Sequence, residues 1–141
     1  MRRASAICPY FWPSPASFVG LVLCGLALPF GARMKVVDGA LEVCGGSIHR
    51  FIALLPRPLR FAAITFGHVI IGVDHAVLDR VRLHEHVHIR QYERWGLFFF
   101  PAYLISSLVQ LVNGRDPYLH NHFEREAFLG AASRGEPRRG G

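Results

Sequence analysis

The segment RLHEHVHIRQYERWG, residues 82–96, gathers three histidines and a glutamate within five positions. His84, Glu85 and His88 match the pattern H-E-x-x-H. On a helix, imidazoles four residues apart share one face, where both can reach a single metal ion. Glu85 lies about 100° around the helix from His84, close enough to act on a water held by the metal, whereas His86 faces away. The segment therefore predicts a metal site with a carboxylate beside it.

The metal in such a site must be held by histidine and carboxylate. The three cysteines, at positions 8, 24 and 44, form no C-x-x-C pair, so neither a thiolate zinc site nor a disulfide framework is predicted. Zinc with nitrogen and carboxylate ligands and one open position lowers the pKa of its water to about 7, and Glu85 can take that proton as attack begins. This is the chemistry of metal-assisted amide hydrolysis, and it requires a third ligand.

The candidates for the third ligand lie in HNHFEREAF, residues 120–128, which we expect to include a separate short helix. They are Glu124 and, as an alternative, Glu126, because neither carboxylate can be oriented from sequence. The tripeptide HNH does not predict a nuclease site, since that site needs spaced residues on a ββα unit.

An H-E-x-x-H followed by E-x-x-A on a second helix resembles the gluzincin metallopeptidases, especially their smallest members, the minigluzincins, over about residues 36–130. The resemblance implies zinc (Zn²⁺) as cofactor, a peptide or protein substrate, and Glu124 as third ligand with Ala127 in the matching place. It also implies a strand before the active-site helix whose edge receives extended substrate, a place occupied by ITFGHVIIG. The block HEHVHIRQYERWG further resembles the H-E-x-x-H-x-x-Q segment of small bacterial proteins that are predicted peptidases.

The chain departs from this family at Phe128, where several gluzincins have an acidic residue that braces a ligand histidine. The bracing group must then be another residue, such as Asp116 or Asn121, or be absent. The candidates for transition-state stabilisation are Tyr92, Tyr118, His120 and His122. Packing roles are expected for Gln91, Tyr92 and Trp95, which seat the helix, and structural roles for His49, His68 and His75.

The elements that must position these residues follow from periodicity and turn signals. We expect a hairpin around Asp38-Gly39, a strand within residues 62–73, a helix over about 75–95 between Asp74 and Gly96, and a last helix from 122. The apolar block 97–112 is predicted to be a core helix beyond Pro101. Were it a transmembrane helix, His88 and Glu124 would lie on opposite sides of the bilayer, so a spanning helix and a three-ligand site exclude each other.

The N-terminal 33 residues begin with two arginines, and residues 16–30 carry no charge. We interpret residues 1–33 as a signal peptide or, preferably, an uncleaved membrane anchor. The protein is then membrane-associated or exported, with 16–30 as the membrane contact. If translation starts at Met34, where MKVVDGALEV opens, it is cytoplasmic.

The predicted fold is an α+β, minigluzincin-like domain over residues 34–131, with a short few-stranded sheet packed on the active-site helix and C-terminal helices, and a disordered basic tail over 132–141. The net charge of +6 comes almost wholly from scattered arginines, which argues against a nucleic-acid partner. The predicted function is zinc-dependent peptide-bond hydrolysis. Two alternatives stay open: a metal-binding pseudo-enzyme without catalysis, and a small integral membrane protein without an active site.

Overall fold

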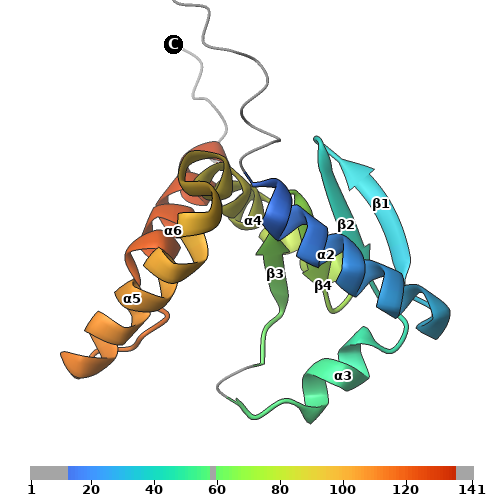
Figure 1. Ribbon diagram of the computed structural model, residues 1–141, viewed down its shortest axis with the longest axis horizontal. Coiled ribbons are helices and arrows are strands. Elements are labelled where there is room, and N and C mark those ends of the chain that lie inside the picture. Colours follow the sequence, from blue (N-terminus) through green and yellow to red (C-terminus); the bar gives the residue numbers. More distant parts are fainter. Residues whose placement is uncertain (1–12, 58–59, 136–141) are drawn as a thin grey trace, which may run out of the picture.

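A computed structural model describes residues 13–57 and 60–135 of the chain (Figure 1). The fold is α+β, with a four-stranded mixed sheet and helices, as the sequence predicts. In chain order the elements are α2 (Ser14–Ala27), η1 (Leu28–Phe30), β1 (Arg33–Val37), β2 (Ala40–Cys44), α3 (Ile48–Leu54), β3 (Ala63–Phe66), β4 (Val69–Gly72), α4 (His75–Trp95), η3 (Gly96–Phe98), α5 (Phe99–Val112) and α6 (His122–Gly135).

The sheet has the strand order β1-β2-β4-β3. Strands β1 and β2 form the predicted hairpin, with positive φ at both Asp38 and Gly39, as a type I′ turn requires. The run 62–73 was expected to be one strand but is a second hairpin, because Gly67 turns the chain with φ 59° and leaves β3 antiparallel to β4. Strand β4 pairs in parallel with β2, so β3 is an edge strand.

Helices cover both faces of this sheet. Side chains alternate along β4: Val69 and Ile71 pack with Cys24 of α2, whereas Ile70 packs with Leu78 of α4. In Figure 1, α2 accordingly lies in front of the sheet and α4 behind it. Because β4 is buried on both faces of the sheet, its sequence is a continuous apolar run and does not alternate between apolar and polar residues.

Helix α4 occupies its predicted range. The Asp74 carboxylate caps it by accepting from Val77 N–H at 2.8 Å, and Gly96 ends it with φ 56°. An ion pair fixes the helix to the sheet, since the Arg82 guanidinium binds the buried Glu42 carboxylate of β2 through two bonds of 2.7 and 2.9 Å. The H-E-x-x-H motif is thus carried on a capped helix that is fixed to the sheet.

The structure does not support the expected N-terminal anchor as a separate segment. Helix α2 packs on the sheet: a Cβ at Gly20 would lie 2.7 Å from Val69 Cβ, and the Ser17 hydroxyl accepts from the His68 N–H at 3.0 Å. Small residues on its inner face allow this close approach. The expected domain start at Met34 leaves out a helix that belongs to the fold, and residues 1–12 of the expected signal or anchor lie outside the described residues.

The chain turns at η3 and returns, so that α6 packs beside α4. Helix α5 begins at Phe99, two residues before Pro101, because a proline in the first turn needs no helical N–H partner. The expectation of a core helix is wrong, since Phe99 is its one buried residue and most of its large apolar side chains are exposed. Helix α6 runs through 132–135, which were assigned to the tail; residues 136–141 lie outside the described part. By length and composition alone, His75–Val112 is the one helical run of the described residues that could cross a membrane.

Candidate metal centre

Helices α4 and α6 approach closely enough for their side chains to meet. Ala127 of α6 is fully buried, and a Cβ at Gly130 would lie only 2.9 Å from the Val87 side chain of α4. Small residues at these positions let α6 lie directly against the helix that carries H-E-x-x-H. Glu124, one turn before Ala127, is thereby brought to the face of α4 that carries His84 and His88.

The three side chains converge on one point. His84 Nε2 lies 3.0 Å from Glu124 Oε2, His88 Nε2 lies 3.4 Å from Glu124 Oε1, and the two Nε2 atoms are 3.1 Å apart. Tetrahedral zinc with bonds near 2.0–2.1 Å would hold neighbouring ligand atoms about 3.3 Å apart. The donor set and its spacing therefore fit zinc, and all three residues are largely buried.

Gln91 orients the His88 ring. Its amide nitrogen donates to Phe123 O at 3.0 Å and to Glu126 Oε2 at 2.8 Å, so its oxygen must face His88 Nδ1, which lies 2.8 Å away. His88 Nδ1 then carries a proton, and Nε2 is the ring atom that faces the cluster. Loss of the proton on Nε2 would leave the tautomer that binds a metal through Nε2.

The site favours an ionised carboxylate. Burial alone would raise the pKa of Glu124, but hydrogen bonds with His84, His88 and Tyr103 outweigh it and hold that pKa well below its usual range. Burial opposes a charge on His88, yet the hydrogen bond and charge of Glu124 raise the pKa of His88. A cation bound by these groups would replace the protons that now join them.

Tyr103 of α5 closes the site from a third helix. Its hydroxyl donates to Glu124 Oε1 at 2.7 Å. Burial, followed by the neighbouring Glu124 carboxylate, raises the pKa of Tyr103, so the phenol stays protonated and remains a donor. Phe99 and Phe128 place aromatic rings against His88 and His84. The cluster is thus enclosed by apolar surface, which strengthens charge interactions inside it.

Glu85 is held by the edge strand. Its buried carboxylate accepts from the Thr65 hydroxyl of β3 at 2.7 Å, and its charge helps to raise the pKa of His88. Glu85 therefore lies close to the cluster and is kept apart from the three converging groups. A carboxylate in this position could accept a proton from a group bound at the cluster.

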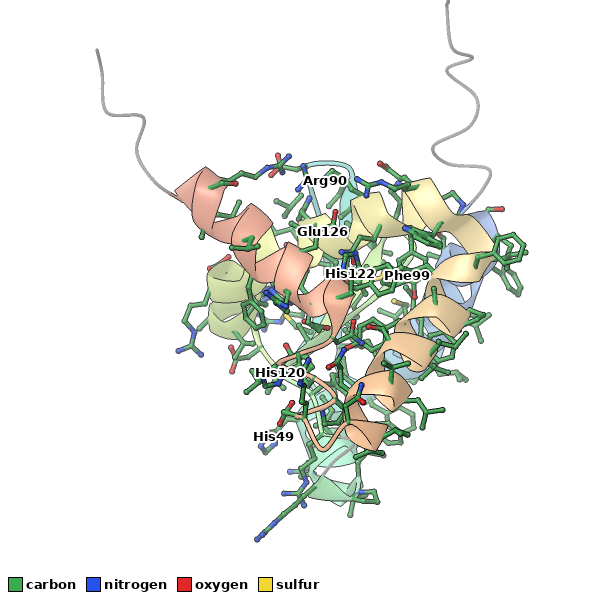
Figure 2. All side chains as sticks on the ribbon, turned by 90° about the vertical axis from the view of Figure 1, so that its left-hand side faces the viewer. His49, Arg90, Phe99, His120, His122 and Glu126 are labelled. Atoms are coloured by element: carbon green, nitrogen blue, oxygen red, sulfur yellow. The ribbon has the colours of Figure 1, made fainter. Side chains whose placement is uncertain are left out.

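The two candidate third ligands have separate surroundings. Glu124 is in the cluster, whereas the Glu126 carboxylate accepts from Gln91 and from Arg94, at 2.8 and 3.3 Å. Figure 2 shows Glu126 on α6 near the α4 helix. In the described structure Glu126 therefore belongs to the network behind His88 rather than to the metal cluster.

The predicted bracing residues act at a distance from the cluster. The exposed Asp116 carboxylate accepts from the N–H groups of Leu119 and Tyr118 and closes a turn. Asn121 is fully buried, donates to Tyr103 O and Ser107 Oγ, and accepts from Phe123 N–H, so it joins the start of α6 to α5. Contrary to the expectation, neither side chain contacts His84 or His88. The residue that holds His88 is Gln91.

The predicted transition-state stabilisers are divided by the structure. Tyr118 lies near the cluster: burial, then the charge of Glu124, raises its pKa. His120 and His122 are exposed, on the loop and at the start of α6 (Figure 2). Tyr92 is buried against Phe99 in the junction of the helices. Tyr118 is the member of this set that the structure places within reach of Glu124.

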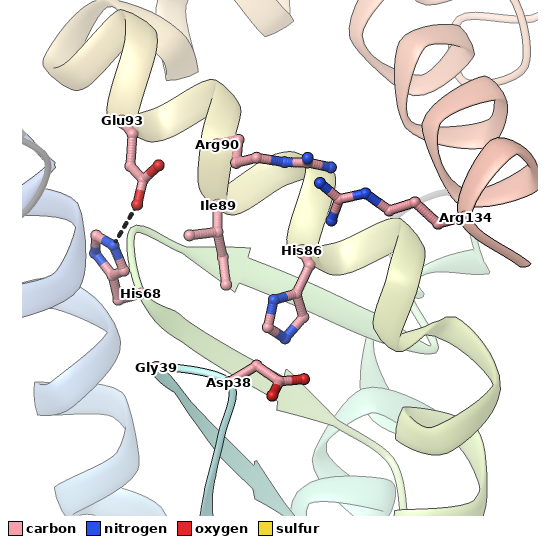
Figure 3. A pocket seen from close by; sticks show the side chains of 8 residues that line it. All are labelled: Asp38, Gly39, His68, His86, Ile89, Arg90, Glu93 and Arg134. Carbon is pink, nitrogen blue, oxygen red and sulfur yellow. Dashed lines mark hydrogen bonds and ion pairs between the residues drawn. The ribbon is translucent and has the colours of Figure 1, made fainter.

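His86 faces away from the cluster, as its position in the motif predicts. It lines a pocket between the β1–β2 turn, α4 and the end of α6 (Figure 3). Burial lowers the pKa of His86, and its Nε2 has no hydrogen-bond partner among the described residues. His68 lies in the same pocket and pairs with Glu93 at 3.0 Å. Neither histidine contributes to the metal cluster.

Sequence reasoning missed three residues of this site: Gln91, Thr65 and Tyr103. A signal existed for Gln91, because it lies three residues beyond His88 on the same helix face and its spacing matches H-E-x-x-H-x-x-Q. Thr65 and Tyr103 carried no local signal, since their roles depend on the packing of β3 and α5 against α4. Comparisons with protein-family models, with curated proteins and with solved structures found no match to the chain.

Proposed function

We propose that this protein is a zinc-dependent peptidase of the minigluzincin type. The observation that carries the proposal is the convergence of His84, His88 and Glu124, whose facing atoms make contacts of 3.0, 3.1 and 3.4 Å, with His88 Nδ1 held by Gln91 so that Nε2 faces the cluster. His84, His88 and Glu124 would hold the metal. Zinc bound there would act as a Lewis acid and lower the pKa of its water to about 7.

The residues around the cluster have distinct roles in this proposal. Glu85, held by Thr65 at 2.7 Å, is the group that takes a proton from the attacking water. Tyr103 and Gln91 orient Glu124 and His88 through bonds of 2.7 and 2.8 Å. Tyr118, half-exposed beside the cluster, is the candidate donor to the developing oxyanion.

The edge strand supplies a place for the substrate. β3 is the terminal strand of the sheet, and its Thr65 contacts Glu85. An extended peptide that paired with the outer edge of β3 would pass beside Glu85 and the cluster. This geometry supports peptide substrates in preference to small molecules.

The test is hydrolysis of a panel of fluorogenic peptides by the zinc-loaded full-length protein and its Glu85→Gln variant. We expect the variant to keep its zinc and to lose activity by a factor of about 10² or more, because proton transfer by a positioned base contributes 10²–10⁴. Glu93→Gln is the matched control, since Glu93 pairs with His68 outside the cluster. Full activity in Glu85→Gln would refute the mechanism; zinc binding without hydrolysis of any peptide would favour the metal-binding pseudo-enzyme.

A further inference from the structure

Helix α5 has the reverse of the polarity expected for a helix on the surface of a water-soluble domain. Its exposed residues are apolar, among them Phe100, Leu104, Ile105, Leu108, Val109 and Val112. Its four polar residues, Tyr103, Ser106, Ser107 and Gln110, are on the side turned toward the protein. Amphipathic helices of soluble proteins place polar residues outward and apolar residues inward.

Helix α2 shows the same reversal with different residues. Its buried positions are small, Gly20 and Cys24, whereas the large side chains point outward. The outward set includes Phe18, Val19, Leu21, Val22 and Leu26, of which Phe18 is 67% exposed. The helix therefore packs on the sheet through its small residues and leaves its most apolar surface uncovered.

The two reversed faces lie on one side of the molecule. In Figure 1 α2 and α5 are the two front helices, and in Figure 2, turned by 90°, both lie along the right-hand side. Helix α2 exposes six large apolar side chains and α5 exposes seven, and large exposed apolar patches mark sites of protein or membrane contact. We call this surface, formed by the outward residues of α2 and α5, the apolar face.

The length of these helices indicates how the apolar face would meet a bilayer. Each helix has 14 residues, which corresponds to about 21 Å and is short of the roughly 30 Å hydrocarbon core. The contact of Glu124 with His84 also keeps both ends of α5 on the same side of any membrane. Both facts favour helices that dip into one leaflet over helices that cross it.

The charges at the helix ends complement an anionic lipid surface. No charged residue lies in 14–32 or 97–114, and each stretch is followed by an exposed cation, Arg33 and Arg115. Lys35 adds a further positive charge beside Arg33, and the whole chain carries +6. Arginine and lysine next to apolar segments bind anionic headgroups while the apolar residues enter the acyl region.

We propose that the apolar face docks the folded domain on an anionic lipid bilayer as a monotopic membrane protein. The inference stands apart from the proposed peptidase activity, because it rests on surface residues that do not contact the metal cluster. Through Tyr103, whose hydroxyl binds Glu124, helix α5 also places the cluster about one helix diameter, roughly 10 Å, from the lipid. Substrates held at the membrane surface would then be close to the site.

The experiment is vesicle flotation with the full-length protein, purified in mild detergent and diluted into vesicles of phosphatidylcholine, with or without phosphatidylglycerol. The variants are Leu108→Glu on the apolar face and Leu129→Glu on α6, a matched control with a similar exposure, 59% against 70%. We expect the protein to float with vesicles, more strongly with phosphatidylglycerol. Leu108→Glu should lower vesicle binding about tenfold or more, and Leu129→Glu should leave it unchanged.

Two results would overturn the proposal. One is protein that stays at the bottom of the gradient with both kinds of vesicle. The other is a Leu108→Glu variant that floats like the unchanged protein. A stable dimer in the absence of detergent, if Leu108→Glu dissociated it into monomers, would also contradict the proposal, because a second copy of the chain would then cover the apolar face. Circular dichroism of each variant checks that the fold is retained.

Discussion

Replacing Gln91 with methionine should weaken zinc binding without touching a ligand. The Gln91 side chain joins three groups: it accepts from His88 Nδ1 at 2.8 Å and donates to Phe123 O and Glu126 Oε2 at 3.0 and 2.8 Å. Methionine fills a similar volume but makes none of these bonds. The His88 ring then loses the partner that fixes its tautomer and its orientation.

The size of the effect follows from the loss of these bonds. Removing the partner of a ligand histidine typically costs 10- to 100-fold in metal affinity, or about 1.4–2.7 kcal/mol. The metal-free protein should lose about 1–3 kcal/mol of stability, since the buried His88 Nδ1–H is left unpaired. Zinc affinity is measured by competition with a chromogenic chelator, and stability by urea unfolding.

The control is the same substitution at the other glutamine. Gln110→Met removes an amide whose buried oxygen has no hydrogen-bond partner among the described residues. Its zinc affinity should stay within about twofold of the unchanged protein. A folded Gln91→Met variant that binds zinc as tightly as Gln110→Met would refute the role of Gln91 in setting the His88 tautomer.

Three further predictions concern the ligands, the base and the pH dependence. Glu124→Gln should abolish zinc binding while Glu126→Gln retains it, and the opposite result by elemental analysis would exchange their roles. Thr65→Val should lower kcat about tenfold or more with zinc content unchanged, because the Glu85 carboxylate loses a hydrogen bond of about 1.5–3 kcal/mol. An unaltered kcat would count against the role of Thr65 in holding Glu85. Burial disfavours a charge on His88, but Glu124 raises the pKa of His88, so zinc must displace a proton from this residue. Zinc affinity should therefore fall as the pH drops through this raised pKa. Equal zinc affinities between about pH 5 and 8 would contradict this.

Local sequence signals predicted the parts of the fold that depend on neighbouring residues. The Asp74 cap, the Gly96 stop and the spacing of His84 and His88 all act within one helix, so the helix and the shared face of the two histidines were predictable. The Asp38-Gly39 turn predicted the first hairpin for the same reason. The second hairpin was missed because the apolar residues on both sides of Gly67 hide the turn within a continuous run.

Tertiary packing decided the remaining features. Helix α2 has the composition of a membrane segment, yet Gly20 and Cys24 pack it on the sheet. Only the fold reveals that the small residues of this helix lie on the side that faces the sheet. Tyr103 reaches Glu124 because α5 turns away from α4 and lies beside α6, a contact between distant residues that periodicity does not encode. Glu124 and Glu126 share one short helix, so the choice between them depended on how α6 is rotated against α4.

The most direct test of the metal centre is the zinc content of the full-length protein, measured by elemental analysis after purification without chelators. His88→Ala is compared with His86→Ala, which removes an imidazole two residues away that faces the pocket on the other side of α4. We expect about one zinc per chain in the unchanged protein and in His86→Ala, and none in His88→Ala. Zinc that is absent from all three proteins, or that persists in His88→Ala, would contradict it.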